Sequence, residues 1–149
     1  MATTTKAIPL DTRNPTASNR RRLWVGRIIS TLPVLFLLID AIMKLVKPRL
    51  VVEATVKLGY SESVIAGLGI VLLACTIIYM IPRTAVLGAI LLTGYLGGAV
   101  ATHVRVGDPL FTIIFPVILG AILWGGLYLR DERVRLLFAT DVGGNSRDS

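Results

Sequence analysis

Ionisable side chains interrupt long apolar stretches of this sequence at two places. Asp40 and Lys44 are four residues apart, so a helix would put them one turn apart on the same face. His103 and Arg105 stand at the end of another apolar stretch. Histidine and aspartate can exchange protons, and lysine or arginine can stabilise a developing anion. These four residues are the candidate ligand or proton site. Hydroxyl groups that could join it belong to Tyr60, Tyr95 and Thr102.

The same residues offer little to a metal or a redox centre. The chain has one histidine and one cysteine, Cys75, so we expect no metal site and no disulfide or redox pair within one chain. No ligand pattern for haem or an iron–sulfur cluster is present either. We therefore predict no intrinsic cofactor, and any electrons would have to come from a partner.

Composition indicates the solvent in which these residues work. Hydrophobic residues make up 54% of the 149 residues and charged residues only 17%, which is too apolar for an ordinary soluble domain. A spanning helix needs about 20 mostly apolar residues. Four windows meet that need: Gly26–Val46, Val64–Ile81, Thr84–Val104 and Leu110–Leu129. The predicted fold is all-α, an integral membrane four-helix bundle.

The remaining segments predict short helices and tails. Pro48 is placed to begin a helix and Gly59 to end one, which predicts a short interfacial helix between spans one and two. A second short helix is expected over 130–138. We predict a disordered cytoplasmic tail over 1–22, a membrane domain over 23–138 and a flexible tail over 139–149.

Basic residues divide unequally between the two ends of the predicted bundle. Eleven lie on the side of both termini and five on the other, so the termini are predicted to be cytoplasmic. Aromatic residues near that boundary agree with an interfacial belt: Trp24, Tyr79, Trp124 and Tyr128. The net charge of +7 is explained by orientation and by attraction to anionic lipid, so no nucleic-acid partner is expected.

Small residues recur at helical spacing in the third span. Gly94 and Gly98 are four apart, as are Gly97 and Ala101, and this pattern lets helix backbones approach closely. We expect this face to pack inside the bundle, with a role in cradling a ligand as the alternative. Pro82 leaves almost no loop between spans two and three, which predicts a tight antiparallel hairpin.

Several runs together resemble the DoxX-like family. They are Asp40-Ala-Ile-Met-Lys44-Leu, Leu58-Gly59-Tyr60, Ile81-Pro82-Arg83-Thr84, the glycine-rich run from Thr93 to Arg105, and Trp124-Gly125-Gly126-Leu127. The similarity covers roughly Gly26 to Leu137. It implies a small four-helix protein of the bacterial inner membrane, with relatives implicated in thiosulfate or quinol redox systems, in oxidative-stress assemblies or in assembling other membrane proteins. The resemblance carries no catalytic assignment to any residue.

Three classes of function remain open. In the first, favoured on the resemblance, the protein is a redox-associated or quinone-binding subunit: His103 and Asp40 exchange protons, Arg105 or Lys44 stabilises an anion, and a membrane or periplasmic redox partner supplies electrons. In the second, the protein is a structural or assembly factor, and the ionisable groups only lock the bundle. The third is a small-solute carrier or stand-alone enzyme, for which four spans would have to oligomerise.

Overall fold

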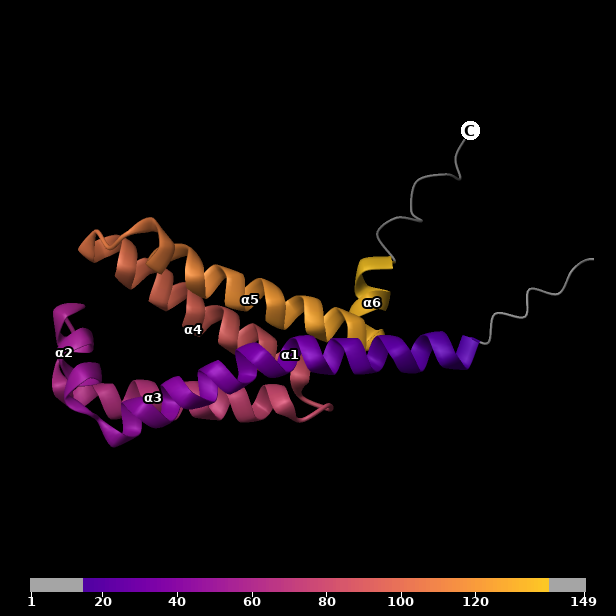
Figure 1. The fold of residues 1–149 in the computed structure, drawn as a ribbon, viewed down its shortest axis with the longest axis horizontal. Helices are drawn as coiled ribbons and strands as arrows, with labels where there is room; N and C mark the ends of the chain where they lie inside the picture. Colours follow the sequence, from indigo (N-terminus) through magenta and orange to yellow (C-terminus); the bar gives the residue numbers. More distant parts are fainter. Residues whose placement is uncertain (1–14, 140–149) are drawn as a thin grey trace, which may run out of the picture.

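The computed structural model describes residues 15–139 as six helices joined by short turns (Figure 1). The helices are α1 (Pro15–Val46), α2 (Arg49–Lys57), α3 (Glu62–Met80), α4 (Ala85–Val106), α5 (Leu110–Arg130) and α6 (Glu132–Ala139). Four of them are long and apolar enough to cross a membrane, namely α1 over Arg20–Val46, α3, α4 and α5. The predicted all-α four-span bundle is thus confirmed, as is the short helix between spans one and two.

The spanning helices form a closed ring, in which α1 packs on α3 and α5, and α4 packs on the same two helices. Figure 1 shows α5 meeting α1 near the end that carries α6, whereas α4 and α5 stand away from α1 and α3 at the end that carries α2. We call these the α6 end and the α2 end. At the α2 end, hydrogen bonds connect the turn after α2 to α4. The ionisable residues of the candidate site lie at this same end.

Helix length sets the depth of each residue in a bilayer. Arg27 lies on α1, and Lys47, 20 residues farther along, directly follows the end of this helix. At 1.5 Å per residue the distance between them along the helix axis is about 30 Å, which equals the usual thickness of the hydrocarbon layer. If Lys47 lies at the boundary of the α2 end, Lys44 lies about 4–5 Å and Asp40 about 10 Å inside the hydrocarbon. With Lys47 at that boundary, the Asp40 carboxylate stands inside the apolar layer.

The turn between α2 and α3 follows the sequence prediction. Pro48 is the N-cap of α2, and Gly59, just beyond its end, has φ +85°, a left-handed conformation that glycine adopts without a steric penalty. The N–H groups of Gly59 and Tyr60 donate to the carbonyls of Val56 and Thr55, which satisfies the helix end. This turn places Tyr60 beside α4.

At its N-terminus, α1 differs from the expected boundary. The helix begins at Pro15, inside the segment 1–22 for which we expected no structure. Proline is well suited to the first turn, and Ala17, the three arginines 20–22 and Leu23 all favour helix, so the helix continues outward beyond the apolar span. The rest of that predicted tail, 1–14, and the part of the C-terminal tail over 140–149 lie outside the described residues.

Tyr79 corrects one part of the predicted aromatic belt, because it is fully buried. Its hydroxyl donates to the carbonyl oxygen of Leu123 at 2.8 Å and lies 3.1 Å from Ser30 Oγ, so the phenol finds polar partners inside the bundle. Arg130 covers its ring and donates to its carbonyl oxygen. Trp24 and Tyr128 remain exposed, at 57% and 44%, as an interfacial belt requires.

The small-residue face of α4 is also corrected. Around Gly94, Gly97 and Gly98 a methyl group would meet nothing within 4 Å, and Ala101 is exposed, so this face does not pack inside the bundle. The orientation of α4 about its own axis is set instead by the short connection after α3, which brings Gly88 close to the backbone of Tyr79. That orientation buries the opposite side of α4, which carries Ala85, Ala89, Leu92 and Leu96.

Candidate functional site

Asp40 and Lys44 form an ion pair on α1, with Lys44 Nζ 2.5 Å from Asp40 Oδ1. The stem of Lys44 is held by a close approach of α3, because a methyl group on Gly69 would lie 2.9 Å from Lys44 Cβ. Only 16% of the Lys44 side chain is accessible, against 34% for Asp40. The Asp40 carboxylate is therefore the more accessible member of the pair.

Tyr95 approaches the same region from α4. Its ring is partly buried and packs against the core cluster that includes Ala41, the chain neighbour of Asp40. Within residues 15–139 the Tyr95 hydroxyl has no hydrogen-bond partner, whereas the fully buried phenol of Tyr79 has two. Inside a bilayer an unpartnered hydroxyl is costly unless a ligand or water satisfies it. Asp40, Lys44 and Tyr95 make up what we call the inner polar site.

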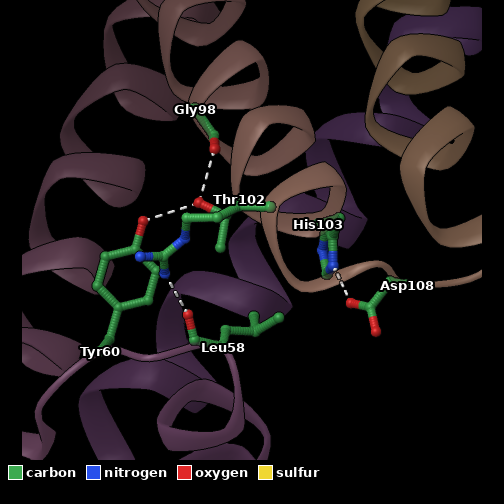
Figure 2. Close-up of polar contacts among 7 residues, drawn as sticks. Leu58, Tyr60, Gly98, Thr102, His103 and Asp108 are labelled. Carbon is green, nitrogen blue, oxygen red and sulfur yellow. Dashed lines mark hydrogen bonds and ion pairs between the residues drawn. The ribbon is translucent and has the colours of Figure 1, made fainter.

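The other two predicted site residues are held elsewhere (Figure 2). His103 Nδ1 lies 2.7 Å from Asp108 Oδ2, and Arg105 Nη2 donates to the carbonyl oxygen of Leu58 at 2.7 Å. Neither contacts Asp40, so the structure does not join the four ionisable residues into one cluster. The cause is local: Gly107 ends α4 with φ +71°, and the Asp108 N–H then bonds back to the His103 carbonyl, which brings the Asp108 carboxylate to the imidazole.

Two contacts connect the turn after α2 to α4 (Figure 2). Tyr60 Oη lies 2.9 Å from Thr102 Oγ1, and Thr102 Oγ1 donates to the Gly98 carbonyl at 2.8 Å, so the tyrosine is the donor in the first bond. The second contact is that of Arg105 with Leu58, which needs glycine at position 59 because a methyl group there would lie 2.9 Å from Arg105 Nη2. We call these two contacts the outer latch.

Replacing Tyr60 by phenylalanine should loosen the outer latch without unfolding the bundle. One hydrogen bond is lost, worth about 1 kcal/mol, while Thr102 keeps its bond to Gly98. Hydrogen exchange followed by mass spectrometry should show faster exchange of the amides in 58–61, about fivefold if that energy is lost locally. Ser61→Ala, which removes the exposed Ser61–Ser63 contact of the same segment, is the control. Equal exchange in both variants would contradict the latch.

Aromatic rings next to the inner polar site were not singled out from the sequence. Phe36 lies one helical turn from Asp40 on α1 and meets Phe115 of α5 edge to face, with ring centroids 5.1 Å apart; Phe111 extends the group. The available signal was the spacing of four between Phe36 and Asp40, but the partner ring across the bundle could not be read from spacing. Together the rings offer a planar ligand an aromatic surface beside the accessible carboxylate.

Metal-binding side chains do not gather in the part of the chain that the structure describes. No three residues among its histidine, cysteine, aspartate and glutamate side chains lie close enough together to hold a metal ion. The chemistry available at the inner polar site is therefore that of one ammonium, one carboxylate and one phenol. Such a set can donate hydrogen bonds to carbonyl oxygens, carry a proton and balance a negative charge.

The fold and this ion pair define a class: a four-span helical membrane protein with a pair of ionisable residues within one of its spans. A comparison with family models gives the narrower assignment. The model of the DoxX-like family matches residues 28–126, about two thirds of the chain, and so includes most of all four spanning helices. The chain belongs to the DoxX-like family. No curated protein and no solved structure matches it.

Proposed function

We propose that this DoxX-like protein binds a quinone at the inner polar site and serves as an accessory subunit of a membrane redox system. The observation that carries the proposal is the accessible carboxylate of Asp40, which pairs with Lys44 within the apolar span Arg20–Val46, at a depth of about 10 Å when the boundary is set at Lys47. Ionisable groups at this depth are costly and usually mark a ligand or proton pathway. Quinones are apolar, planar and soluble in the bilayer, so they reach such a site without leaving the membrane.

Donors at the site suit the two carbonyl oxygens of a quinone ring. Lys44 has three N–H groups, of which Asp40 takes one, and the Tyr95 hydroxyl has no partner within residues 15–139. Phe36 and Phe115 supply the aromatic surface on which a ring can stack. Each oxygen could thus accept one hydrogen bond, one from α1 and one from α4.

Reducing a quinone to a quinol takes two electrons and two protons. Asp40 is the carboxylate at the inner polar site that can hand on a proton. The His103–Asp108 pair, about four fifths buried near the α2 end, can exchange protons between this region and water. Electrons come from a membrane or periplasmic redox partner, since the donor set contains no redox centre.

Orientation enters the proposal through charge. In the described part of the chain, eight basic residues at the α6 end against five at the α2 end favour cytoplasmic termini in the bacterial inner membrane. The α2 end, with the outer latch and His103, would then face the periplasm. A redox partner would meet the protein on that side or within the membrane.

Uncovered small residues on α4 favour a second candidate function, contact with a helix of another membrane protein or of a second copy. Gly94, Gly97, Gly98 and Ala101 are exposed, and a methyl group added at any of the three glycines would meet no other described residue within 4 Å. Faces of this kind allow close helix packing in membranes. An assembly factor would use this face and not the inner polar site, so the two functions depend on different residues.

The experiment for the first proposal is quinone binding by Tyr95→Phe. Losing one hydrogen bond should weaken binding of a short-tailed ubiquinone about three- to tenfold. Native mass spectrometry of purified protein, titrated with the quinone, measures the bound fraction. Tyr128→Phe, at the opposite end of the bundle, is the matched control and should bind as the parent does. Unchanged affinity in Tyr95→Phe, or no binding by the parent, would overturn the inner polar site as a quinone site.

A further inference from the structure

Arginines dominate the charge at the α6 end of the described chain. Eight basic residues lie there, all arginine, against two acidic residues, Asp131 and Glu132. At the α2 end, three lysines and two arginines face four acidic residues, so the charge is close to balanced. The asymmetry therefore concerns the kind of cation as well as the number.

Six of these arginines are exposed and have no ion-pair partner within residues 15–139. We call them the arginine belt: Arg20, Arg21, Arg22, Arg27, Arg83 and Arg133. The other two are engaged, Arg130 with Tyr79 and Arg135 with Glu132. The belt draws on α1, the turn between α3 and α4, and α6, so it extends around the end of the bundle.

The level of the belt is that of lipid headgroups. Arg27 lies at the hydrocarbon boundary by the 30 Å estimate, and Arg20–Arg22 lie about 8–10 Å farther out along α1. Figure 1 shows this part of α1 projecting beyond the turn between α3 and α4. Trp24, which is 57% exposed, stands between the two levels, where indole rings favour the interface.

We infer that the arginine belt binds the phosphate groups of anionic phospholipids in the leaflet at the α6 end. A guanidinium forms two parallel hydrogen bonds to a phosphate, which an ammonium cannot do. The belt has six guanidinium groups without an ion-pair partner within residues 15–139, and the four on α1 lie at headgroup level, so the belt matches a surface of such phosphates in charge. Orientation during insertion would need only positive charge, which lysine supplies equally well. This inference does not rest on the proposed quinone site.

Lipid retention by purified protein tests the inference. The full chain is extracted, mixed with equal amounts of phosphatidylglycerol and phosphatidylcholine in detergent, and examined by native mass spectrometry. The parent should retain phosphatidylglycerol in preference to phosphatidylcholine. In Arg21→Gln/Arg22→Gln that preference should fall about tenfold or more, because each basic side chain near an anionic surface adds to the free energy of binding. Orientation in the cell does not affect a measurement made in micelles.

Controls separate the belt from net charge. Arg49→Gln/Lys57→Gln removes two exposed charges from α2 at the other end and should keep the preference of the parent. Arg21→Lys/Arg22→Lys keeps the charge and should keep the preference but retain less of both lipids, since both carry a phosphate and the paired hydrogen bonds to it are gone. Equal loss of preference in the α2 variant, unchanged retention of both lipids in the lysine variant, or no preference in the parent would each overturn the inference.

Discussion

Replacing Asp40 by asparagine should destabilise the bundle by about 2–3 kcal/mol. The variant leaves the Lys44 ammonium, whose side chain is only 16% accessible, without its anionic partner at hydrocarbon depth. Truncating one member of such a pair is costly because the remaining charge still has to be kept out of water. Unfolding in mixed micelles, followed by the loss of helical circular dichroism, should show the change as a lower midpoint.

The double variant Asp40→Asn/Lys44→Met distinguishes a structural lock from a functional site. Without either charge, stability should return to about that of the parent, since apolar replacements of ion pairs are often neutral or stabilising. Quinone binding should be weakened in this variant, because the Lys44 donor and the Asp40 carboxylate are gone and only the Tyr95 hydroxyl is left to bind the ring. If the ion pair is only a lock, the double variant should instead bind like the parent.

Glu53→Gln is the matched control for Asp40→Asn. It replaces an exposed carboxylate on α2, at the same end of the bundle but outside the apolar layer, and should shift stability by less than about 0.5 kcal/mol. An Asp40→Asn midpoint equal to that of Glu53→Gln would mean that Asp40 and Lys44 are hydrated, which contradicts the depth assigned to them.

Length and apolar composition were sufficient to predict the spanning helices, because a bilayer demands about 20 apolar residues in a row whatever their order. Both boundaries of each predicted span lie within two residues of the boundaries of the corresponding helix, apart from the start of α1, which extends farther toward the N-terminus. Pro48 and Gly59 were equally informative about α2, since their backbone requirements are local. Such features depend on a few neighbouring residues, and the sequence contains them.

Helix rotation was harder to predict, for a physical reason. In a soluble helix an apolar stripe marks the buried side, but the spanning helices here are apolar all round, so no stripe points inward. The glycine spacing in α4 was therefore assigned to the bundle interior, although the structure exposes it and buries Gly88. The burial of Tyr79 was missed for the same reason.

Contacts between distant residues were the least predictable part of the site. Asp40 and Lys44 could be paired from spacing alone, because four residues make one helical turn. The partners of His103 and Arg105 depended on the left-handed turns at Gly107 and Gly59, each of which redirects the chain. A different backbone conformation at Gly107 or Gly59 would give His103 or Arg105 a different partner.

Gly88→Ala should destabilise the protein by about 3 kcal/mol, because it forces apart the hairpin of α3 and α4. A methyl group at position 88 would lie 2.3 Å from the Tyr79 nitrogen and 2.4 Å from its Cα, and backbone atoms cannot rotate away as a side chain can. Moving Tyr79 would also disturb its bond to the Leu123 carbonyl and the contact with Arg130. Unfolding in mixed micelles measures the loss.

Gly98→Ala is the matched control on the same helix. Nothing lies within 4 Å of a methyl group there, and alanine is the better helix former by as much as about 1 kcal/mol, so this variant should be neutral or slightly more stable than the parent. The same chemical change should thus have opposite signs at two positions of α4. Destabilisation by Gly98→Ala with no effect of Gly88→Ala would mean that α4 is rotated from the orientation described, with its glycine face inward. Opposite signs in the expected order would establish that Gly88 sets the rotation of α4, and with it the side of the helix from which Tyr95 approaches Asp40.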